Sequence, residues 1–331
     1  MKIGPLDLGE RPLLLAPMED VTDVSFRVLC REQGAAMVYT EFVNSDGLVR
    51  DVPKTIAKMH TLEEEAPVGI QIYGQHPDAM VDAARMAERA AELTGGHGAD
   101  LVDINFGCPV SKIAGRGAGS GMMREPDKMV AITKAVVEAV GKPVTVKTRL
   151  GWDDNSKIIV ELAERLQDVG IAALTIHGRT RCQLYKGEAD WTLIGAVKAN
   201  PRMHIPIIGN GDITDGPSAK HAFERYGVDG IMIGRATFGH PWIFREIRHY
   251  LDHGEPMPAL TVAEKVALAR RHLALSLQYK GEPRGIYEMR RHLSCYFKGL
   301  PDFKETRMRM VTTLDVAELN DILDTIEQRY D

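Results

Sequence analysis

The chain has 331 residues, of which 44% are hydrophobic and 26% charged, and its formal net charge is −5. This is the composition of an ordinary globular protein, which excludes collagen-like, disordered and low-complexity chains. The length suits two domains of similar size, or one α/β barrel of about 250 residues followed by a smaller unit.

Four cysteines, at positions 30, 108, 182 and 295, form no CxxC pair and no zinc-ligand spacing, so no metal site is expected. Sparse thiols without a signal peptide predict a cytoplasmic protein, and no apolar run reaches the roughly 18 residues that span a membrane. The net negative charge argues weakly against a nucleic-acid partner for the chain as a whole.

Eight short apolar runs recur through the first 235 positions. They are residues 13–16, 36–40, 68–72, 101–105, 144–148, 173–177, 206–210 and 230–234. Most are continuous rather than alternating, which is typical of strands buried on both faces of a parallel sheet. A helical pattern follows these runs, most clearly at 77–93, 125–140, 157–169 and 218–226. Eight such repeats predict a TIM (β/α)8 barrel.

A doubly wound open sheet would give the same alternation. However, no GxGxxG follows the first strand, and polar residues stand at the C-terminal ends of nearly all the strands, which favours a closed barrel. Beyond the strands only helical patterns remain, at 242–253, 263–280, 285–298 and 316–329. The sequence therefore predicts a barrel domain over 1–242 and an all-helical domain over 243–331.

The first and third strands end in groups that suit a flat heterocycle. Pro17 and Met18, in the segment APM, offer apolar contact, and the amide of Gln71 can both donate and accept hydrogen bonds. On their own, these residues are more often plain packing residues. Cys108 follows the fourth strand in a Gly-Cys-Pro turn, where it is either a buried small hydrophobe or, as a neutral thiol, a proton donor at the barrel mouth.

Cations gather after the fifth and sixth strands. Lys147 and Arg149 point to the same side because side chains alternate along a strand. Lys147 is a candidate for a Schiff-base amine, an anion clamp or a structural ion pair, since a buried lysine needs a partner. His177, Arg179 and Arg181 share the next loop, which indicates a polyanion nearby unless the loop is simply solvated.

Glycine-containing turns follow the seventh and eighth strands, at 208–212 and 233–235. These two loops are the usual phosphate site of a TIM barrel, and Arg235 adds a positive charge. Together the groups at the mouth fit a phosphorylated planar cofactor, for which flavin mononucleotide (FMN) is a better match than pyridoxal phosphate, because no clear pyridinium partner is present.

Several of these segments resemble the flavin-dependent tRNA-dihydrouridine synthases. They are APMEDVTD, YTEF, DINFGCP, VKTRLGW, HGRTRCQLYKGEADW, IGNGDI and GIMIGRA. The resemblance covers about the first 245 residues and is greatest to the bacterial B-type branch. Glu19-Asp20 depart from the family pattern, in which small residues commonly follow APM.

The resemblance implies an oxidoreductase that reduces the C5=C6 bond of specific uridines in tRNA, with NADPH as reductant and FMN as carrier. Hydride would pass from flavin N5 to C6, and Cys108 would give the proton to C5 as general acid. The other implied roles are: around the isoalloxazine, Ala16, Pro17, Met18 and Gln71; at its edge, Lys147 and His177; at the phosphate, Asn210, Gly211, Asp212, Gly234 and Arg235; and near the uracil, Asn105.

The helical tail decides the substrate class. Between 265 and 309 it carries eleven Lys and Arg against four Asp and Glu, with tyrosines interleaved, in a chain whose total charge is negative. Cations beside stacking rings favour RNA. We therefore expect Arg290 and Arg291, with Arg149, Arg179 and Arg181 at the mouth, to contact tRNA. A flavoenzyme for a small dihydropyrimidine or dihydroorotate, and an RNA-binding protein with an inactive barrel, are the alternatives.

Overall fold

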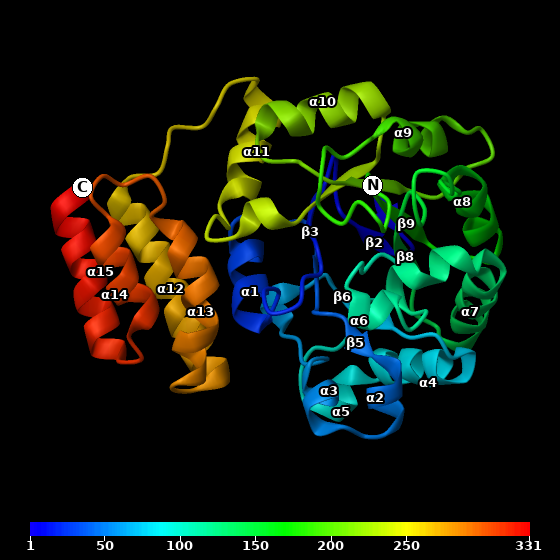
Figure 1. Cartoon of the computed structure of the whole chain (residues 1–331), viewed down its shortest axis with the longest axis horizontal. Coiled ribbons are helices and arrows are strands. Elements are labelled where there is room, and N and C mark those ends of the chain that lie inside the picture. Colours follow the sequence, from blue (N-terminus) through cyan, green and yellow to red (C-terminus); the bar gives the residue numbers. More distant parts are fainter.

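A computed structural model describes all 331 residues, and at its centre lies a ring of eight parallel strands (Figure 1). In ring order they are β3 (Leu13–Leu15), β11 (Gly230–Ile233), β10 (Ile207–Asn210), β9 (Ala173–His177), β8 (Val144–Arg149), β7 (Leu101–Asn105), β6 (Val68–Tyr73) and β4 (Val38–Tyr39). A parallel bridge between Leu14 and Met37 joins the two ends of this order. The structure is the predicted TIM barrel, and all eight predicted strands are present.

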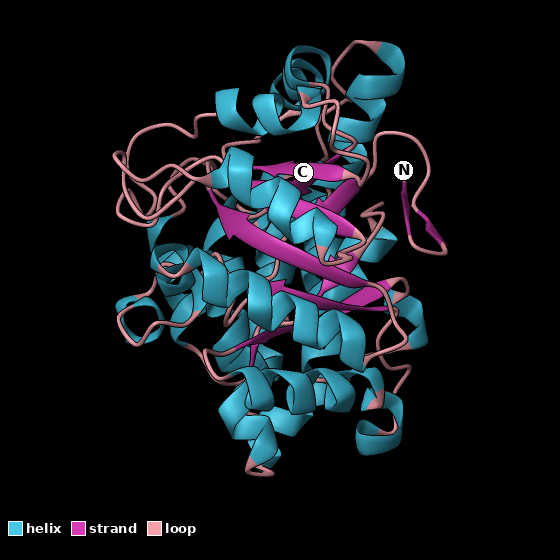
Figure 2. Cartoon of the chain, turned by 90° about the vertical axis from the view of Figure 1, so that its right-hand side faces the viewer, coloured by secondary structure: helices cyan, strands magenta, loops and turns pink.

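Helices surround the strands, as the magenta strands and cyan helices of Figure 2 show. Those of the barrel are α1 (Val24–Glu32), α2 (Ser45–Val49), α3 (Pro53–Ala57), α4 (Pro77–Glu88), α5 (Ala90–Thr94), α6 (Ser111–Ala114), α7 (Pro126–Ala139), α8 (Ile159–Asp168), α9 (Thr192–Ala199) and α10 (Gly216–Tyr226). Because both faces of the strands are covered, every residue of β7 and β9 is buried. This explains why the strand sequences are continuously apolar.

Short elements that the sequence did not reveal complete the barrel domain. They are the antiparallel pair β1 (Lys2–Ile3) and β2 (Leu6–Asp7), strand β5 (Val43–Asn44) beside β6, and the 3-10 turns η1 (Glu63–Glu65), η2 (Gly119–Arg124) and η3 (Arg235–Thr237). The three strands have two residues each, too few to show a periodic pattern.

The C-terminal part is helical, as predicted: α11 (Ile243–His253), α12 (Val262–Lys280), α13 (Arg284–Tyr296), α14 (Lys304–Thr312) and α15 (Val316–Tyr330). The sequence did not predict α14, in which Met310 is the only buried residue, so it lacks an apolar stripe. Helix α11 contributes Ile243, Phe244 and Ile247 to the barrel core, whereas α12 to α15 enclose a core of their own. We therefore propose a domain boundary between α11 and α12 rather than at 242.

The helical domain lies against α1, on the left of the barrel in Figure 1. The ring of Phe26 on α1 contacts His292 and His272, with centroids 4.2 and 5.5 Å apart. The Lys280 ammonium pairs with Asp23, the residue that caps α1. Apolar contact and ion pairing thus fix the two domains to each other. None of the helices is long and apolar enough to cross a membrane.

Candidate active site

The C-terminal ends of the strands surround a cavity of about 630 Å³, a volume typical of cofactor sites. Fourteen of the eighteen residues predicted from the sequence line it, which supports one common site. They are Ala16, Pro17, Met18, Asn105, Cys108, Lys147, Arg149, His177, Asn210, Gly211, Asp212, Gly234, Arg235 and Arg291. Gln71, Arg179, Arg181 and Arg290 lie outside the cavity wall.

Cys108 borders the cavity and is only 9% exposed. Its turn is anchored on both sides: Asn105 Oδ1 accepts hydrogen bonds from the backbone N–H groups of Gly107 (2.9 Å) and Cys108 (2.8 Å), and the Ser120 hydroxyl donates to the Cys108 carbonyl (2.8 Å). Burial raises the pKa of the thiol. A neutral thiol held in a fixed place can give up a proton.

Behind Asn105 a chain of polar side chains runs into the barrel. The Asn105 amide nitrogen donates to Gln71 Oε1 (2.8 Å), and Gln71 Nε2 donates to Asp103 (2.5 Å). Thr145 also donates to Asp103 (2.5 Å), and burial raises the pKa of this carboxyl to about 6. Gln71 is fully buried and uses both ends of its amide within the protein. The structure therefore places it beneath the cavity, as a support for Asn105.

Lys147 and His177 each bring a polar group to the cavity wall that has no hydrogen-bond partner in the protein. Burial, and the nearby Arg149, lower the pKa of Lys147 to about 8, and no hydrogen bond holds its amine. Burial likewise lowers the pKa of His177 far below its usual value, so the ring is neutral at pH 7. Its Nδ1 atom is buried and has no hydrogen-bond partner. An unpaired buried polar atom such as His177 Nδ1 is costly, and a ligand with polar edges would satisfy it and contact the free amine of Lys147.

Arg149 connects two loops of the mouth. Its guanidinium donates to the carbonyl of Gly107 (2.8 Å), in the turn of Cys108, and to those of Thr180 and Leu184 (both 3.0 Å), after β9. Burial lowers the pKa of Arg149 to about 10, so the charge persists at pH 7. Arg149 thus keeps the Cys108 turn in register with the next loop while it borders the cavity.

The predicted phosphate loops meet at one corner of the cavity. The Asn210 amide donates to the Met232 carbonyl (2.8 Å) and joins the ends of β10 and β11. Gly211 has a φ of +126°, and a Cβ atom there would lie 2.7 Å from that of Ala189, so only glycine fits. The guanidinium of Arg235 is half exposed beside these turns. At this corner the backbone can approach a ligand closely, and Arg235 adds a half-exposed positive charge.

Asp212 organises this corner by pairing with two arginines. It accepts hydrogen bonds from Arg179 at 2.9 and 2.6 Å and from Arg235 at 3.1 Å. Burial alone would raise the pKa of Asp212, but the Arg179 contacts lower it. Arg179, predicted to contact the substrate, is 2% exposed, and its remaining donors bind the carbonyls of Lys186 and Gly187. The structure makes Arg179 a support of the loop after β9.

The other two predicted cations, Arg181 and Arg290, make cation–π contacts with aromatic rings outside the cavity. The Arg181 guanidinium lies 4.7 Å from the centre of the Trp152 ring, and that of Arg290 lies 5.0 Å from the Tyr287 ring. Arg290 also donates to the Thr312 carbonyl (2.9 Å). Neither reaches the cavity, and both are partly exposed.

Three aromatic residues also border the cavity, although none of them was predicted as a site residue. Tyr185 is 52% exposed and lies 4.6 Å from the Arg235 guanidinium, measured to the ring centre. Phe42 and Phe238 also line the cavity. The signals for Tyr185 and Phe42 were their places in two segments that carry the family resemblance, whereas nothing in the sequence marked Phe238.

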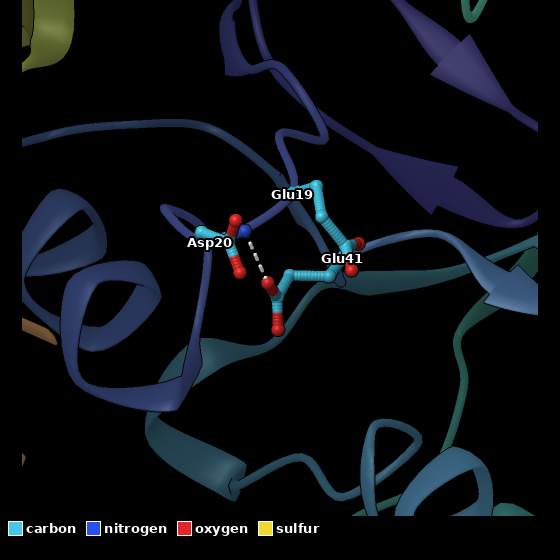
Figure 3. Close-up of side chains that lie close together, drawn as sticks. All are labelled: Glu19, Asp20 and Glu41. Carbon is cyan, nitrogen blue, oxygen red and sulfur yellow. Dashed lines mark hydrogen bonds between the residues drawn. The ribbon is translucent and has the colours of Figure 1, made fainter. Parts of the chain in front are cut away.

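The two unusual acids after APM belong to an acidic cluster formed with Glu41 (Figure 3). Glu41 accepts a hydrogen bond from the Asp20 backbone N–H (2.5 Å), and burial raises the pKa of its carboxyl. Lys58 pairs with Glu19, which borders the cavity. The cluster gives one side of the mouth a negative charge that Lys58 balances in part.

The helical domain has less free positive charge than its sequence suggests. Five of its cations pair with carboxylates: Arg270, Arg271, Lys280, Arg284 and Arg309. Six cations of the basic stretch have no carboxylate partner: Lys265, Arg290, Arg291, Lys298, Lys304 and Arg307. Arg291 is the one that extends from this domain into the cavity wall. A negatively charged ligand at the mouth can thus contact both domains.

Comparison with known proteins gives a consistent result over nearly the whole chain. The family model described as "Dihydrouridine synthase (Dus)" matches residues 14–330. The "tRNA-dihydrouridine synthase B" of Pseudomonas aeruginosa is 40% identical over 328 residues, 99% of this chain and 93% of the relative. That of Vibrio vulnificus is 39% identical over 331 residues, 100% and 99% of the two chains. The "Probable tRNA-dihydrouridine synthase 1" of Synechocystis sp. is 43% identical over 327 residues, 98% and 88%.

Solved structures with the same fold are more distant. Histamine dehydrogenase from Rhizobium sp. 4-9 superposes with a TM-score of 0.57 at 12% identity, over 100% of this chain and 64% of that one. A 2-naphthoyl-CoA reductase bound to 2-naphthoyl-CoA gives 0.54 at 13% identity, over 77% and 52%. At such low identity the likeness concerns the fold alone.

Proposed function

The chain belongs to the dihydrouridine synthase family, and we propose from its site how it carries out that activity: it reduces the C5=C6 bond of uridine in tRNA to 5,6-dihydrouridine. The relatives named tRNA-dihydrouridine synthase B place it with the B-type bacterial branch. They support this activity over the oxidation of a small dihydropyrimidine, the alternative from sequence. The observation that carries the proposal is Cys108, a neutral buried thiol on the wall of a large cavity.

The residues of the cavity fit a flavin, and we infer that the flavin is FMN. The unpaired Nδ1 of His177 and the unpaired amine of Lys147 suit the polar edge of an isoalloxazine, and Ala16, Pro17 and Met18 offer it an apolar wall. Gly211, Gly234 and Arg235 would receive a single phosphate. When bound, reduced flavin supplies a hydride to C6 of the uracil ring.

The protein's own part in the reaction is to hold the ring and deliver a proton. Charge develops toward C5 and O4 as C6 is reduced, and the protonated Cys108 thiol then donates its proton to C5. Asn105 fixes the thiol through the backbone of its turn. The positive charges of Lys147 and Arg149 stabilise negative charge that develops at the mouth.

We further propose that NADPH is the reductant and that tRNA reaches the mouth along the helical domain. No dinucleotide motif stands elsewhere in the chain, so the reductant would use the same mouth. Six cations without carboxylate partners and the approach of Arg291 to the cavity support an RNA substrate.

The test is direct. The purified protein should be incubated with NADPH and a tRNA transcript that carries no modification, and the nucleosides analysed by mass spectrometry. Dihydrouridine should form only when protein and reductant are both present, and the protein should release FMN on denaturation. A protein loaded with FMN that oxidises NADPH but leaves the tRNA unchanged would contradict the activity.

A further inference from the structure

Three side chains outside the cavity form a cationic aromatic cluster that the proposed reaction does not use. Arg124 and Arg181 place their guanidinium carbons 4.1 and 4.7 Å from the centre of the Trp152 ring. We name this cluster the rim platform. Arg124 ends η2, Trp152 follows β8 and Arg181 follows β9, so the platform stands on loops at the C-terminal ends of the strands.

The charges of the rim platform are not neutralised within the protein. The acids closest to it in sequence have other partners: Glu125 pairs with Lys128, Asp154 with Lys157, and Asp153 with the hydroxyl of Ser156. Neither guanidinium pairs with a carboxylate, and the Nε of Arg181 is buried without any hydrogen-bond partner. Two like charges on one ring repel each other, so the arrangement favours a bound anion.

The platform is also held in place before any ligand binds. The Arg181 N–H donates to the Gly151 carbonyl and the Cys182 N–H to the Trp152 carbonyl, both at 2.9 Å, which joins the two loops. Met123, the residue before Arg124, is buried against the Thr148 hydroxyl (3.1 Å). Trp152 packs on the barrel core with its partly buried ring. A prearranged site loses little entropy on binding.

The position of the platform in the barrel points to its ligand. In the ring of eight strands, β8 is four steps from β3 in either direction, so the loops after these strands lie on opposite sides of the mouth. Helix α1 follows β3 and carries the helical domain, whereas α7 and α8, beside the platform, lie on the other side of the barrel (Figure 1). A polyanion that contacts both the helical domain and the platform must cross the mouth above Cys108.

We propose that Arg124, Trp152 and Arg181 bind the sugar–phosphate backbone of the RNA beside the target uridine, on the side remote from the helical domain. The inference rests on the proposed function. Guanidinium groups bind phosphate with two parallel hydrogen bonds, and the Trp152 ring between them holds both guanidinium groups in place. The RNA is thus held at two places, one on each side of the cavity, so that the uridine between them meets the thiol.

The experiment measures binding of an unmodified tRNA transcript to the flavin-loaded enzyme by fluorescence anisotropy, between about 50 and 200 mM salt. In the double variant Arg124→Gln/Arg181→Gln we expect the Kd for tRNA to rise about tenfold and the slope of log K against log salt to fall by about 1 to 2. Trp152→Leu should weaken binding without changing the slope. The matched control is Arg85→Gln/Lys134→Gln, two exposed cations on the outer faces of α4 and α7.

The outcomes separate the possibilities. A wild-type Kd and salt slope in the double arginine variant overturn the proposal, as does a raised KM for NADPH with unchanged tRNA binding, since the anion would then be the phosphate of the reductant. Because Trp152 contacts the core, its variant can lose stability, but Arg124 is exposed and Arg181 only half-buried, so the double arginine variant keeps the test valid. Dihydrouridine formation by the wild-type enzyme is measured in parallel. Its absence refutes the proposed function, whereas unchanged tRNA binding by the variants refutes the platform alone.

Discussion

The side-chain oxygen of Asn105 accepts a hydrogen bond from the backbone N–H of Cys108, with 2.8 Å between the two atoms. The amide nitrogen of Asn105 donates at the same time to Gln71, which donates in turn to Asp103 in the barrel interior. The place of the thiol is therefore set by a polar chain that begins among the buried strands. The thiol itself and its placement can be tested separately.

Replacing Cys108 by alanine should remove the proton donor and leave the cavity open. We expect FMN content and tRNA affinity to stay at wild-type values while dihydrouridine formation falls by about 100-fold or more. The rate at which tRNA reoxidises the reduced enzyme measures this step directly. Cys182→Ala, which removes an exposed thiol outside the cavity, is the control and should behave as wild type. Full activity in Cys108→Ala would show that another group supplies the proton.

Replacing Asn105 by alanine should leave the thiol present but poorly placed. The Cys108 turn would lose the two hydrogen bonds that Asn105 Oδ1 accepts and keep only that of Ser120, and we expect turnover to fall about tenfold or more, with a smaller change in the KM for tRNA. Asn105→Asp keeps the accepting oxygen and should recover part of kcat. A loss of FMN or of thermal stability that matches the loss of turnover would mean that Asn105 is structural only.

The fold could be predicted from the sequence because each strand is marked by residues that are neighbours in the chain. Each strand of the barrel is a continuous apolar run, and the predicted runs at 101–105 and 173–177 agree with β7 and β9 residue for residue. Helix α14 was missed for the same reason: its residues are largely exposed, so no apolar stripe marks them.

The site was predicted less completely because partner choice is not local. Arg179 was expected to face the substrate, but its carboxylate partner Asp212 lies 33 residues further on, at the end of another strand. Gln71 was expected to face the cofactor, and its partners Asp103 and Asn105 are also more than thirty residues away. The spacing of residues shows which groups reach the mouth, whereas the fold decides which of them are already paired.

Lys147 should make flavin binding depend on pH. With its pKa lowered to about 8 in the free protein, the amine is charged below pH 8 and loses its proton above it. A bound flavin with a phosphate favours the charged form, so its affinity should be constant below pH 8 and fall as the pH rises beyond it. Equilibrium titration of the apoprotein with FMN checks this. In Lys147→Met the affinity should be lower and should no longer change across this range; the same pH dependence in that variant would assign it to another group.

Asp212 pairs with one buried and one half-exposed arginine, and we expect the first pair to matter for stability and the second arginine for cofactor binding. Asp212→Asn leaves the buried Arg179 without a counter-charge, and we expect a loss of stability, seen as a lower thermal midpoint of the apoprotein. Arg235→Gln removes the half-exposed partner instead and should lower FMN affinity while the thermal midpoint changes little. The reverse pattern in the two variants would contradict this division of roles.

The contact between Asp23 and Lys280 should make the attachment of the helical domain sensitive to acid. Burial alone would raise the pKa of Asp23, but the Lys280 ammonium lowers it to about 2. A carboxyl whose pKa is lower in the folded state than in the unfolded state stabilises the fold above pH 4, and this contribution, about 2 kcal/mol, is lost as the pH falls from about 4 to 2. Asp23→Asn should therefore lower stability at pH 7 and flatten the acid transition, followed by tryptophan fluorescence. Asp7→Asn, in an exposed pair with Lys2, is the control and should leave the transition unchanged.

The same variant should also affect the use of tRNA, because the helical domain packs on α1. We expect Asp23→Asn to raise the KM for tRNA while NADPH still reduces the flavin at the wild-type rate. An unchanged KM would mean that apolar packing alone, around Phe26, positions the domain.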